Sequence, residues 1–215
     1  TYDGLRHGIS VTAPTGAVIQ YGTEREKCNL SSSPSFVAAG TYTVFYEVKA
    51  SDYQTYKGSA VVDISKKNIS SCTIQDVGTG IYNGKAHTPS VTVYDRGTVL
   101  GKDTDYTITY SNNINAGTAT ITVNGKGNYS GSAVKTFSIM KTNMSVSASG
   151  YSGTYDQTAH GIGLNISNPA NGSGAVVRYG TSSGTYNLSS SPTYKNAGSY
   201  TVYYQVTAPN YNAYT

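Results

Sequence analysis

The sequence has no tryptophan, three phenylalanines and two cysteines, and charged residues make up 12% of its 215 residues. This charged share is about half of what soluble globular domains usually carry. Lysine and arginine are scattered, and Lys66-Lys67 is the only adjacent basic pair. A nucleic-acid-binding surface needs a basic patch or stripe. We therefore expect no nucleic-acid partner.

Long apolar runs are also missing. No run approaches the ~18–20 residues that a membrane-spanning helix needs, so we expect no membrane insertion within this chain. No signal peptide is visible either. However, Thr1 falls inside a repeat, which predicts that the natural N-terminus lies upstream.

What the sequence has in abundance is glycine and tyrosine, with 24 and 21 residues. Together with serine, threonine and asparagine they give a polar but uncharged surface, which favours an extracellular β-protein over a cytosolic enzyme. The two cysteines, Cys28 and Cys72, lie in different repeats. A disulfide would need their Cα atoms within about 7 Å, and the sequence leaves open whether they form one or stay as two thiols.

Three copies of a turn followed by a strand organise the chain, at residues 39–48, 115–123 and 196–206. The first and third copies share a pattern that begins Ala-Gly-[Thr/Ser]-Tyr-Thr-Val, and the second is a variant. Repeats of this length indicate a modular architecture. We predict three modules: 1–66 (type A), 67–141 (type B) and 142–215 (type A).

Short alternating segments separated by Gly and Asn turns predict strands and no significant helix. The predicted strands of the first two repeats lie at residues 9–12, 17–21, 41–49, 58–64, 90–94, 105–110, 118–124 and 133–140. Alignment of the repeats predicts that the first lacks its first strand and the third lacks its last. Open strand edges of this kind can template self-association.

A tyrosine in these repeats has the spacing of the tyrosine corner of immunoglobulin folds. Tyr42 and Tyr200 each follow a glycine by two positions and precede a valine by two. The second repeat departs from this pattern, so a corner there has to come from Tyr106 or Tyr110, or is absent. We predict an all-β fold of tandem immunoglobulin-like β-sandwich modules with an elongated arrangement.

Several short patterns carry a resemblance to a known family. The chain contains Tyr-[Asp/Asn]-Gly, Tyr-Gly-Thr, Asn-Leu-Ser-Ser-Ser-Pro and Ala-x-Asn-Tyr segments. It resembles the Ig-like, or MBG-type, tandem repeats of adhesin-like cell-surface proteins of Gram-positive gut Firmicutes. That resemblance covers essentially the whole chain and implies a secreted or wall-anchored bacterial protein in which the repeats form a stalk.

The three histidines, His7, His87 and His160, are the first candidates for a metal site. Each follows the same tyrosine by five residues, at one position per repeat. Single histidines in separate modules do not converge on one ion. We therefore assign them a structural role in a turn or at a strand edge, and we predict no metal site and no cofactor.

The carboxylates also follow the turns. Asp3, Asn83 and Asp156 occupy one repeated turn position, which is explained by Asx-type hydrogen bonding. The other acids considered are Glu24, Glu26, Glu47, Asp103 and Asp105. No catalytic pair, nucleophile elbow or phosphate loop is recognisable, and we predict no enzymatic activity and no catalytic residue.

The tyrosines leave one alternative open. Aromatic side chains at adjacent strand positions place rings on both faces: Tyr42, Phe45, Tyr46, Tyr203 and Tyr204. One face belongs to the core, while the other is either the rim of a thin sandwich, which we favour, or an exposed binding stripe. The sequence thus predicts a non-catalytic stalk or spacer of an extracellular bacterial protein, whose contacts are neighbouring repeats. The alternative is a module that recognises a host protein such as an immunoglobulin, or a host glycan, through strand edges or tyrosine-rich faces. The sequence alone does not identify a ligand-binding residue.

Overall fold

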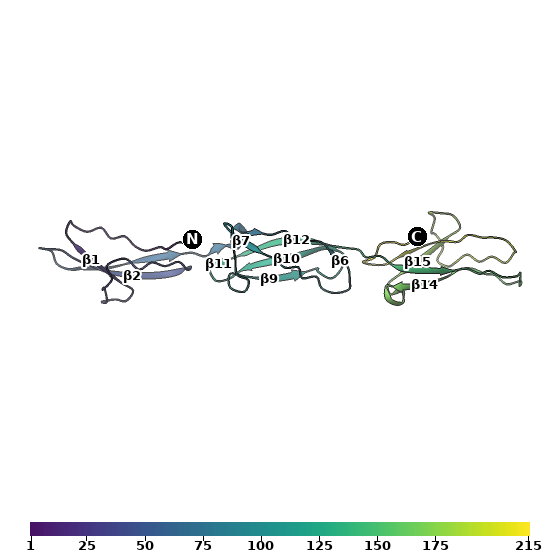
Figure 1. Ribbon diagram of the computed structural model, residues 1–215, viewed down its shortest axis with the longest axis horizontal. Helices are drawn as coiled ribbons and strands as arrows, with labels where there is room; N and C mark the ends of the chain where they lie inside the picture. The colour runs from purple at the N-terminus through teal and green to yellow at the C-terminus, as the bar shows by residue number, and fades with distance from the viewer. The chain divides into compact units, whose positions relative to one another are not determined.

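The computed structural model describes all 215 residues and is all-β, with 44% of residues in strands and 3% in short helical turns (Figure 1). The two helical turns are the 3₁₀ segments η1 (Ile69–Ser71) and η2 (Ala170–Gly172). No helix is long and apolar enough to cross a membrane. The prediction of an all-β chain without significant helix is confirmed.

The chain forms two compact units. The first comprises Thr1–Asp76, Val91–Thr109 and Ile121–Lys135, and the second comprises Val77–Ser90, Tyr110–Thr120 and Thr136–Thr215. The second sequence repeat thus contributes residues to both units. The three module boundaries read from the sequence remain predictions.

The first unit contains three sheets. An antiparallel sheet has the order β1-β2-β3, a second has the order β5-β7-β8, and β11 pairs in parallel with β4. Their bounds are β1 (Val18–Gly22), β2 (Gly40–Lys49), β3 (Tyr56–Ile64), β4 (Lys67–Asn68), β5 (Thr73–Ile74), β7 (Val93–Asp95), β8 (Thr98–Val99) and β11 (Tyr129–Ser130).

The second unit contains two antiparallel pairs, β13-β14 and β15-β16. Their strands are β13 (Ser145–Ser149), β14 (Gly163–Asn168), β15 (Val176–Gly180) and β16 (Tyr203–Thr207). The remaining sheet has the order β6-β12-β10-β9. Its strands are β6 (Gly80–Ile81), β9 (Tyr106–Ser111), β10 (Gly117–Gly125) and β12 (Ser132–Met140), and Figure 1 shows β9, β10 and β12 side by side.

The glycine-tyrosine spacing at the start of β2 has a steric cause. A Cβ atom on Gly40 would lie 3.0 Å from the hydroxyl oxygen of Tyr42, so a larger residue would displace the ring that folds back over the turn. The Tyr42 hydroxyl then donates a hydrogen bond to the Ala38 carbonyl at 3.0 Å. Its ring stacks on Phe36 with centroids 4.0 Å apart. The motif thus closes the turn that leads into the strand.

Alternation along β2 builds the core of the first repeat. Val44 is fully buried and packs with Tyr21, Val62 and Ile64, while Tyr42 and Tyr46 pack against the edge of this cluster. Tyr42 and Tyr46 lie on the same face of β2 as Val44, so they belong to the face that both interpretations assign to the core, and the choice between rim and binding stripe stays a prediction.

One predicted strand is absent, the strand predicted in the third repeat begins later than expected, and the residues concerned pair with no neighbour. Residues 9–12 form no strand, although their counterpart in the third repeat, β14, pairs with β13. Residues 199–202 form no strand either, although their counterparts in β2 pair with β3 from Thr41↔Asp63 to Val44↔Ala60. Strand conformation here follows from pairing rather than from local sequence.

Substitution of Val44 tests this dependence. Val44→Ala removes about two methylene equivalents from a fully buried site and should lower the free energy of unfolding of the first repeat by about 2 kcal/mol. Val202→Ala, at the equivalent position without a paired strand, should cost clearly less. Urea unfolding followed by repeat-specific NMR signals measures both, and equal losses would contradict this packing argument.

Candidate functional site

The tyrosine-Asx turn recurs three times with the same local hydrogen bond. The side-chain oxygen Oδ1 of Asp3 accepts from the Leu5 amide at 2.9 Å, and Asn83 and Asp156 accept from the amides two residues on at the same distance. These are the Asx turns that the sequence predicts. The recurring acid at this position has a structural role in the turn.

The histidines complete the same turns. His7 Nε2 lies 2.8 Å from Asp3 Oδ1, and His160 Nε2 lies 3.0 Å from both carboxylate oxygens of Asp156. In the second repeat Asn83 replaces the acid, and the buried Nε2 of His87 has no hydrogen-bond partner. His7 and His160 also form isolated bridges to Phe36 and Tyr194. The predicted turn and strand-edge role is confirmed for these two residues.

Hydrogen bonding sets the electrostatics of the turn. Donation from the Thr158 side chain and backbone, with the contact to His160, holds the pKa of Asp156 well below its ordinary value of 3.8. The contact to His7 and the Leu5 amide lower the pKa of Asp3 in the same way. No group of three or more His, Cys, Asp or Glu side chains is arranged to hold a metal ion.

The other candidates from the sequence are dispersed. Glu24, Glu26 and Glu47 form exposed or half-exposed ion pairs with Lys27, Lys57 and Lys49. Asp105 accepts a hydrogen bond from the Gly101 amide at 2.9 Å, and the Asp103 amide donates to the Tyr106 carbonyl at 2.7 Å. Both cysteines are free thiols, and burial raises the pKa of Cys72.

A second recurring element joins consecutive repeats, and the sequence analysis assigned it no role. We call it the Asx-Tyr turn: residues 50–53, 126–129 and 208–211, each ending in Asp-Tyr or Asn-Tyr. In each one the tyrosine amide donates to the carbonyl three residues earlier, at 3.0–3.3 Å. Two of the three turns dock on the repeat that precedes them.

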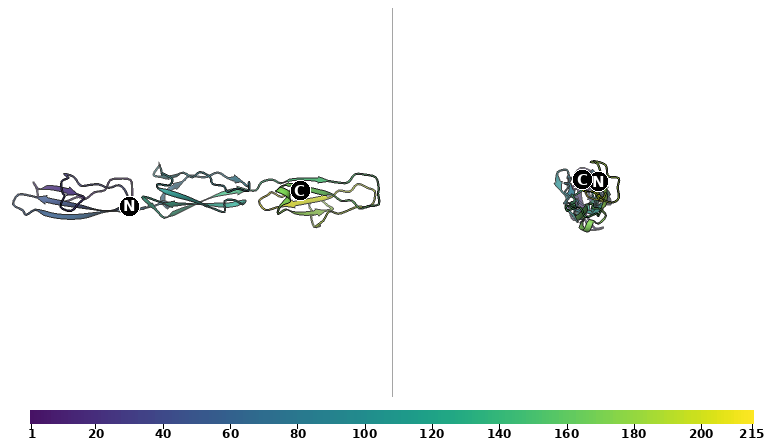
Figure 2. Two further views of the ribbon diagram at one scale, coloured as in Figure 1. Left: turned by 90° about the horizontal axis from the view of Figure 1, so that it is seen from below. Right: turned by 90° about the vertical axis from the view of Figure 1, so that its right-hand side faces the viewer.

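The first docked turn lies within the first unit. The Asn128 side chain accepts a hydrogen bond from the Ala39 amide at 2.9 Å, and its carbonyl accepts from the Lys67 amide at 3.0 Å. The Tyr129 ring meets Tyr2 edge-on, with centroids 5.5 Å apart. Figures 1 and 2 show the N-terminal stretch beside this region.

An ion pair next to Tyr129 stabilises this docked turn. Lys67 pairs with Asp95, and both side chains are largely buried. The Tyr129 hydroxyl donates to the second oxygen of Asp95 at 3.0 Å. Burial raises the pKa of Tyr129, and the negative charge of Asp95 raises it further. The Tyr129 side chain is thereby held by the contact of its ring with Tyr2 and by the hydrogen bond from its hydroxyl to Asp95.

The second docked turn, in the second unit, repeats the two hydrogen bonds and the aromatic contact of the first. The Asn210 side chain accepts from the Ala116 amide at 2.8 Å, and its carbonyl accepts from the Thr142 amide at 3.1 Å. Tyr211 meets Tyr82 edge-on at 5.7 Å, as Tyr129 meets Tyr2. Asn210 also donates to the side chain of Asn115 at 3.0 Å.

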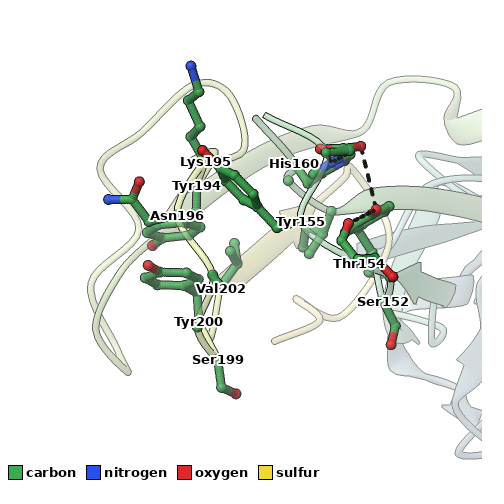
Figure 3. Close-up of a pocket in the computed structure, with 18 residues that line it drawn as sticks. Ser152, Thr154, Tyr155, His160, Tyr194, Lys195, Asn196, Ser199, Tyr200 and Val202 are labelled. Carbon is green, nitrogen blue, oxygen red and sulfur yellow. Dashed lines mark hydrogen bonds and ion pairs between the residues drawn. The ribbon is translucent and has the colours of Figure 1, made fainter. Parts of the chain in front are cut away.

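The corresponding surface of the third repeat is an open recess of about 410 Å³ (Figure 3). Its lining includes Tyr155, the counterpart of Tyr2 and Tyr82, and Ala197, the counterpart of Ala39 and Ala116. Tyr194 and Tyr200 stack at 4.0 Å on one side, and His160 stacks on Tyr151 at 3.4 Å on the other. We take this recess as the candidate site.

The Ala-x-Asn-Tyr segment contributes to the resemblance to known repeats, but it predicts no docking contact. Its signal was the recurrence of Asx-Tyr at a fixed place after each long strand. The Asp95-Lys67 pair gave no such signal, because its two members are 28 residues apart and occur in one repeat only.

The lowered pKa of Asp156 predicts how stability depends on pH. Because its carboxylate is stabilised by folding, it contributes stability above its ordinary pKa of 3.8, and that contribution is lost as the pH falls through the lower folded value. Asp156→Asn should therefore lower the thermal midpoint at neutral pH. Asparagine keeps the turn itself, as Asn83 does.

Thermal unfolding followed by circular dichroism measures this effect from neutral pH to about pH 2. The difference between the wild-type chain and Asp156→Asn should be largest at neutral pH and should shrink as the pH falls below 3.8. A difference that stays constant over this range would contradict the assignment.

Comparison with known proteins adds no relative to this picture. No family model matches the chain, and the searches of curated proteins and of solved structures give no match. The site is therefore interpreted from the chain's own repeats, which present the same surface twice with a docked turn and once without.

Proposed function

We propose that this chain is a non-catalytic repeat region of a bacterial cell-surface or secreted adhesin-like protein, and that it acts as a spacer. The observation that carries the proposal is the docked Asx-Tyr turn, which joins consecutive repeats with the same contacts in both units. A spacer has to keep its modules in order, and a recurring joint does so without any ligand.

The strength of the joint can be estimated from its parts. A side chain to backbone hydrogen bond contributes about 0.5–1.5 kcal/mol, and an edge-to-face aromatic pair adds a similar amount. With the second backbone hydrogen bond, one joint is worth about 2–4 kcal/mol. This favours the docked state over the open one by about 30-fold or more, so nearest-neighbour contacts couple the repeats.

The proposal includes an immunoglobulin-like fold for each module. In support of it, the Tyr42 hydroxyl bonds to a backbone carbonyl four residues upstream, as in a tyrosine corner. In the second repeat Tyr106 and Tyr110 donate to the carbonyls of Val91 and Pro89 at 3.1 and 2.6 Å. Both tyrosines that are candidates for a corner in the second repeat thus bind backbone carbonyl groups.

The low charge, the abundance of tyrosine and the resemblance to surface repeats support an extracellular location. The same composition leaves room for a second candidate function, which is recognition of a host glycan or of a host protein such as an immunoglobulin. The observation that favours it is the exposed aromatic surface around the recess: Tyr151, Tyr155 and Tyr200 are 49, 56 and 47% exposed.

A binding screen tests the second candidate. If the chain is a recognition module, it should bind a member of a panel of host glycans, mucin and immunoglobulins saturably, and Tyr200→Ala should abolish that binding. Val134→Thr, at an exposed apolar position on β12 away from the recess, is the control. A chain that binds no panel member counts for the spacer alone.

The joints themselves are tested by one substitution in each. Asn128→Ala removes the acceptor of the Ala39 amide, and Asn210→Ala removes that of the Ala116 amide. Amide hydrogen exchange should speed up about fivefold at Ala39 in the first variant and at Ala116 in the second, because each loses about 1 kcal/mol of protection. Each variant should leave the other amide unchanged.

The chain provides a matched control. Asp52 occupies the equivalent place in the first repeat, and in this structure its turn is undocked, with Tyr53 68% exposed. Asp52→Ala should therefore change neither amide. NMR relaxation provides the functional readout, because repeats released from a joint tumble more independently. Unchanged tumbling in both Asn variants would contradict the role of the joints in a spacer.

A further inference from the structure

The ion pair of Lys67 and Asp95 differs from the other lysine-carboxylate pairs of the chain in its burial. Its two side chains are 13 and 12% exposed, whereas every other such pair has at least one side chain that is more than half exposed. Ile69 and Val93, two residues from the pair along the chain, are fully buried. Removing two charges from water costs free energy that their attraction does not always return, so stability alone does not explain this burial.

Three strands of the first unit bring the functional groups together. Lys67 lies on β4, Asp95 on β7 and Tyr129 on β11, and the pairing of β4 with β11 places Lys67 opposite Tyr129. The Lys67 ammonium contacts Oδ1 of Asp95, and the Tyr129 hydroxyl donates to Oδ2 of Asp95 at 3.0 Å. The carboxyl group is thus held between an amine and a hydroxyl donor.

An ammonium and a carboxylate in contact contain all the atoms of an amide and one water molecule. One proton passes from Nζ of the lysine to Oδ1 of the aspartate, and the amine lone pair then forms a bond to Cγ. A second proton moves from Nζ to the same oxygen, the Cγ–Oδ1 bond breaks, and water leaves. Nothing is oxidised or reduced, and no co-reactant is needed.

Tyr129 is placed to assist this condensation. When the amine adds to Cγ of Asp95, negative charge develops on Oδ2, which is the oxygen to which Tyr129 donates. A fixed donor at such an oxygen stabilises the transition state. Burial raises the pKa of Tyr129, so its hydroxyl keeps the proton that it donates. The neutral amide also removes the cost of burying two charges.

The pair is ionised before it reacts. Burial raises the pKa of Asp95, but the hydrogen bonds from Lys67 and Tyr129 outweigh this effect and hold the pKa below its ordinary value. The first proton transfer is therefore uphill, and the reaction is slow. A slow reaction is sufficient, because each chain reacts once and there is no enzymatic turnover.

We propose that Lys67 and Asp95 form an intramolecular amide cross-link between Nζ and Cγ, with Tyr129 as the hydrogen-bond donor to the developing oxyanion. The cross-link joins β4, at the start of the second repeat, to β7. It connects residues 28 positions apart and therefore restricts the unfolded chain as a disulfide does. This inference goes beyond the spacer function and does not depend on it.

The mass of the intact folded chain tests for the bond. The wild type should be lighter than its sequence predicts by one water molecule. Lys67→Arg should have its full mass, because the guanidinium group keeps the charge but does not lose its proton. Lys135→Arg, at the exposed pair with Asp76, is the matched control and should lose water as the wild type does. Circular dichroism checks that both variants keep the strand content of the wild type.

Peptide mapping and kinetics locate the bond and test the role of the donor. Trypsin should fail to cleave after Lys67, and fragmentation should show a branched peptide that joins Lys67 to Asp95. Tyr129→Phe keeps the ring and removes the hydroxyl. The loss of water after cell-free synthesis should be about a hundredfold slower in this variant than in the wild type.

A wild type that keeps its full mass after prolonged incubation in the folded state would overturn the proposal. The same holds if Lys67→Arg loses the same water, or if the loss maps to a succinimide at Asp3-Gly4. An unchanged rate in Tyr129→Phe would contradict the role of its hydroxyl. The hydrogen-exchange test at Ala39 and Ala116 uses other variants and another readout, so failure of the spacer function and failure of the cross-link can be told apart.

Discussion

Docking between consecutive repeats of this chain depends on one kind of hydrogen bond. In it, a backbone amide of one repeat donates to the side chain of an asparagine in the next. The donors are Ala39 and Ala116, and each lies in the turn just before a long strand. Neither amide has another partner within the protein, and an unpaired amide at a half-buried position is costly. The asparagine side chain accepts the otherwise unpaired amide of the neighbouring repeat, and the asparagine is also part of the turn of its own repeat. The geometry of one repeat therefore determines how the next repeat docks.

This contact matters because the individual repeats are small. The core of the first repeat centres on four buried residues, with Tyr42 and Tyr46 against its edge. Domains of roughly 75 residues bury a modest share of their surface and are marginal alone. Tyr129 of the second repeat is 3% exposed and meets Tyr2 of the first repeat edge-on, so part of its burial comes from the joint. Part of the stability therefore resides in the contacts to neighbours, as in other repeat proteins.

The sequence was sufficient to predict the features of the fold that depend on neighbouring residues. The alternation in β2 and β12 predicts both strands to within two residues, because apolar side chains every second position define a buried face. The Asx turns at Asp3, Asn83 and Asp156 were predictable for the same reason, since the hydrogen bond spans two residues.

Prediction failed where the cause lies elsewhere in the chain. Residues 9–12 and 199–202 have strand-like sequences, but a strand needs a partner, and none pairs with them. Asn128 and Asn210 look like ordinary turn residues, because nothing local marks the amide, 89 and 94 residues away, to which each side chain bonds. The fold class was therefore readable from the sequence, while the joint and the recess required the structure.

The two joints use the same atoms although they connect different kinds of repeat. In one a type A repeat receives a type B turn, and in the other a type B repeat receives a type A turn. The groups that receive a turn and the groups that supply one occur in both types. A repeat of either type can therefore be duplicated, deleted or exchanged by recombination without a compensating change in its neighbours. The joint makes the number of repeats free to vary while it fixes their direction.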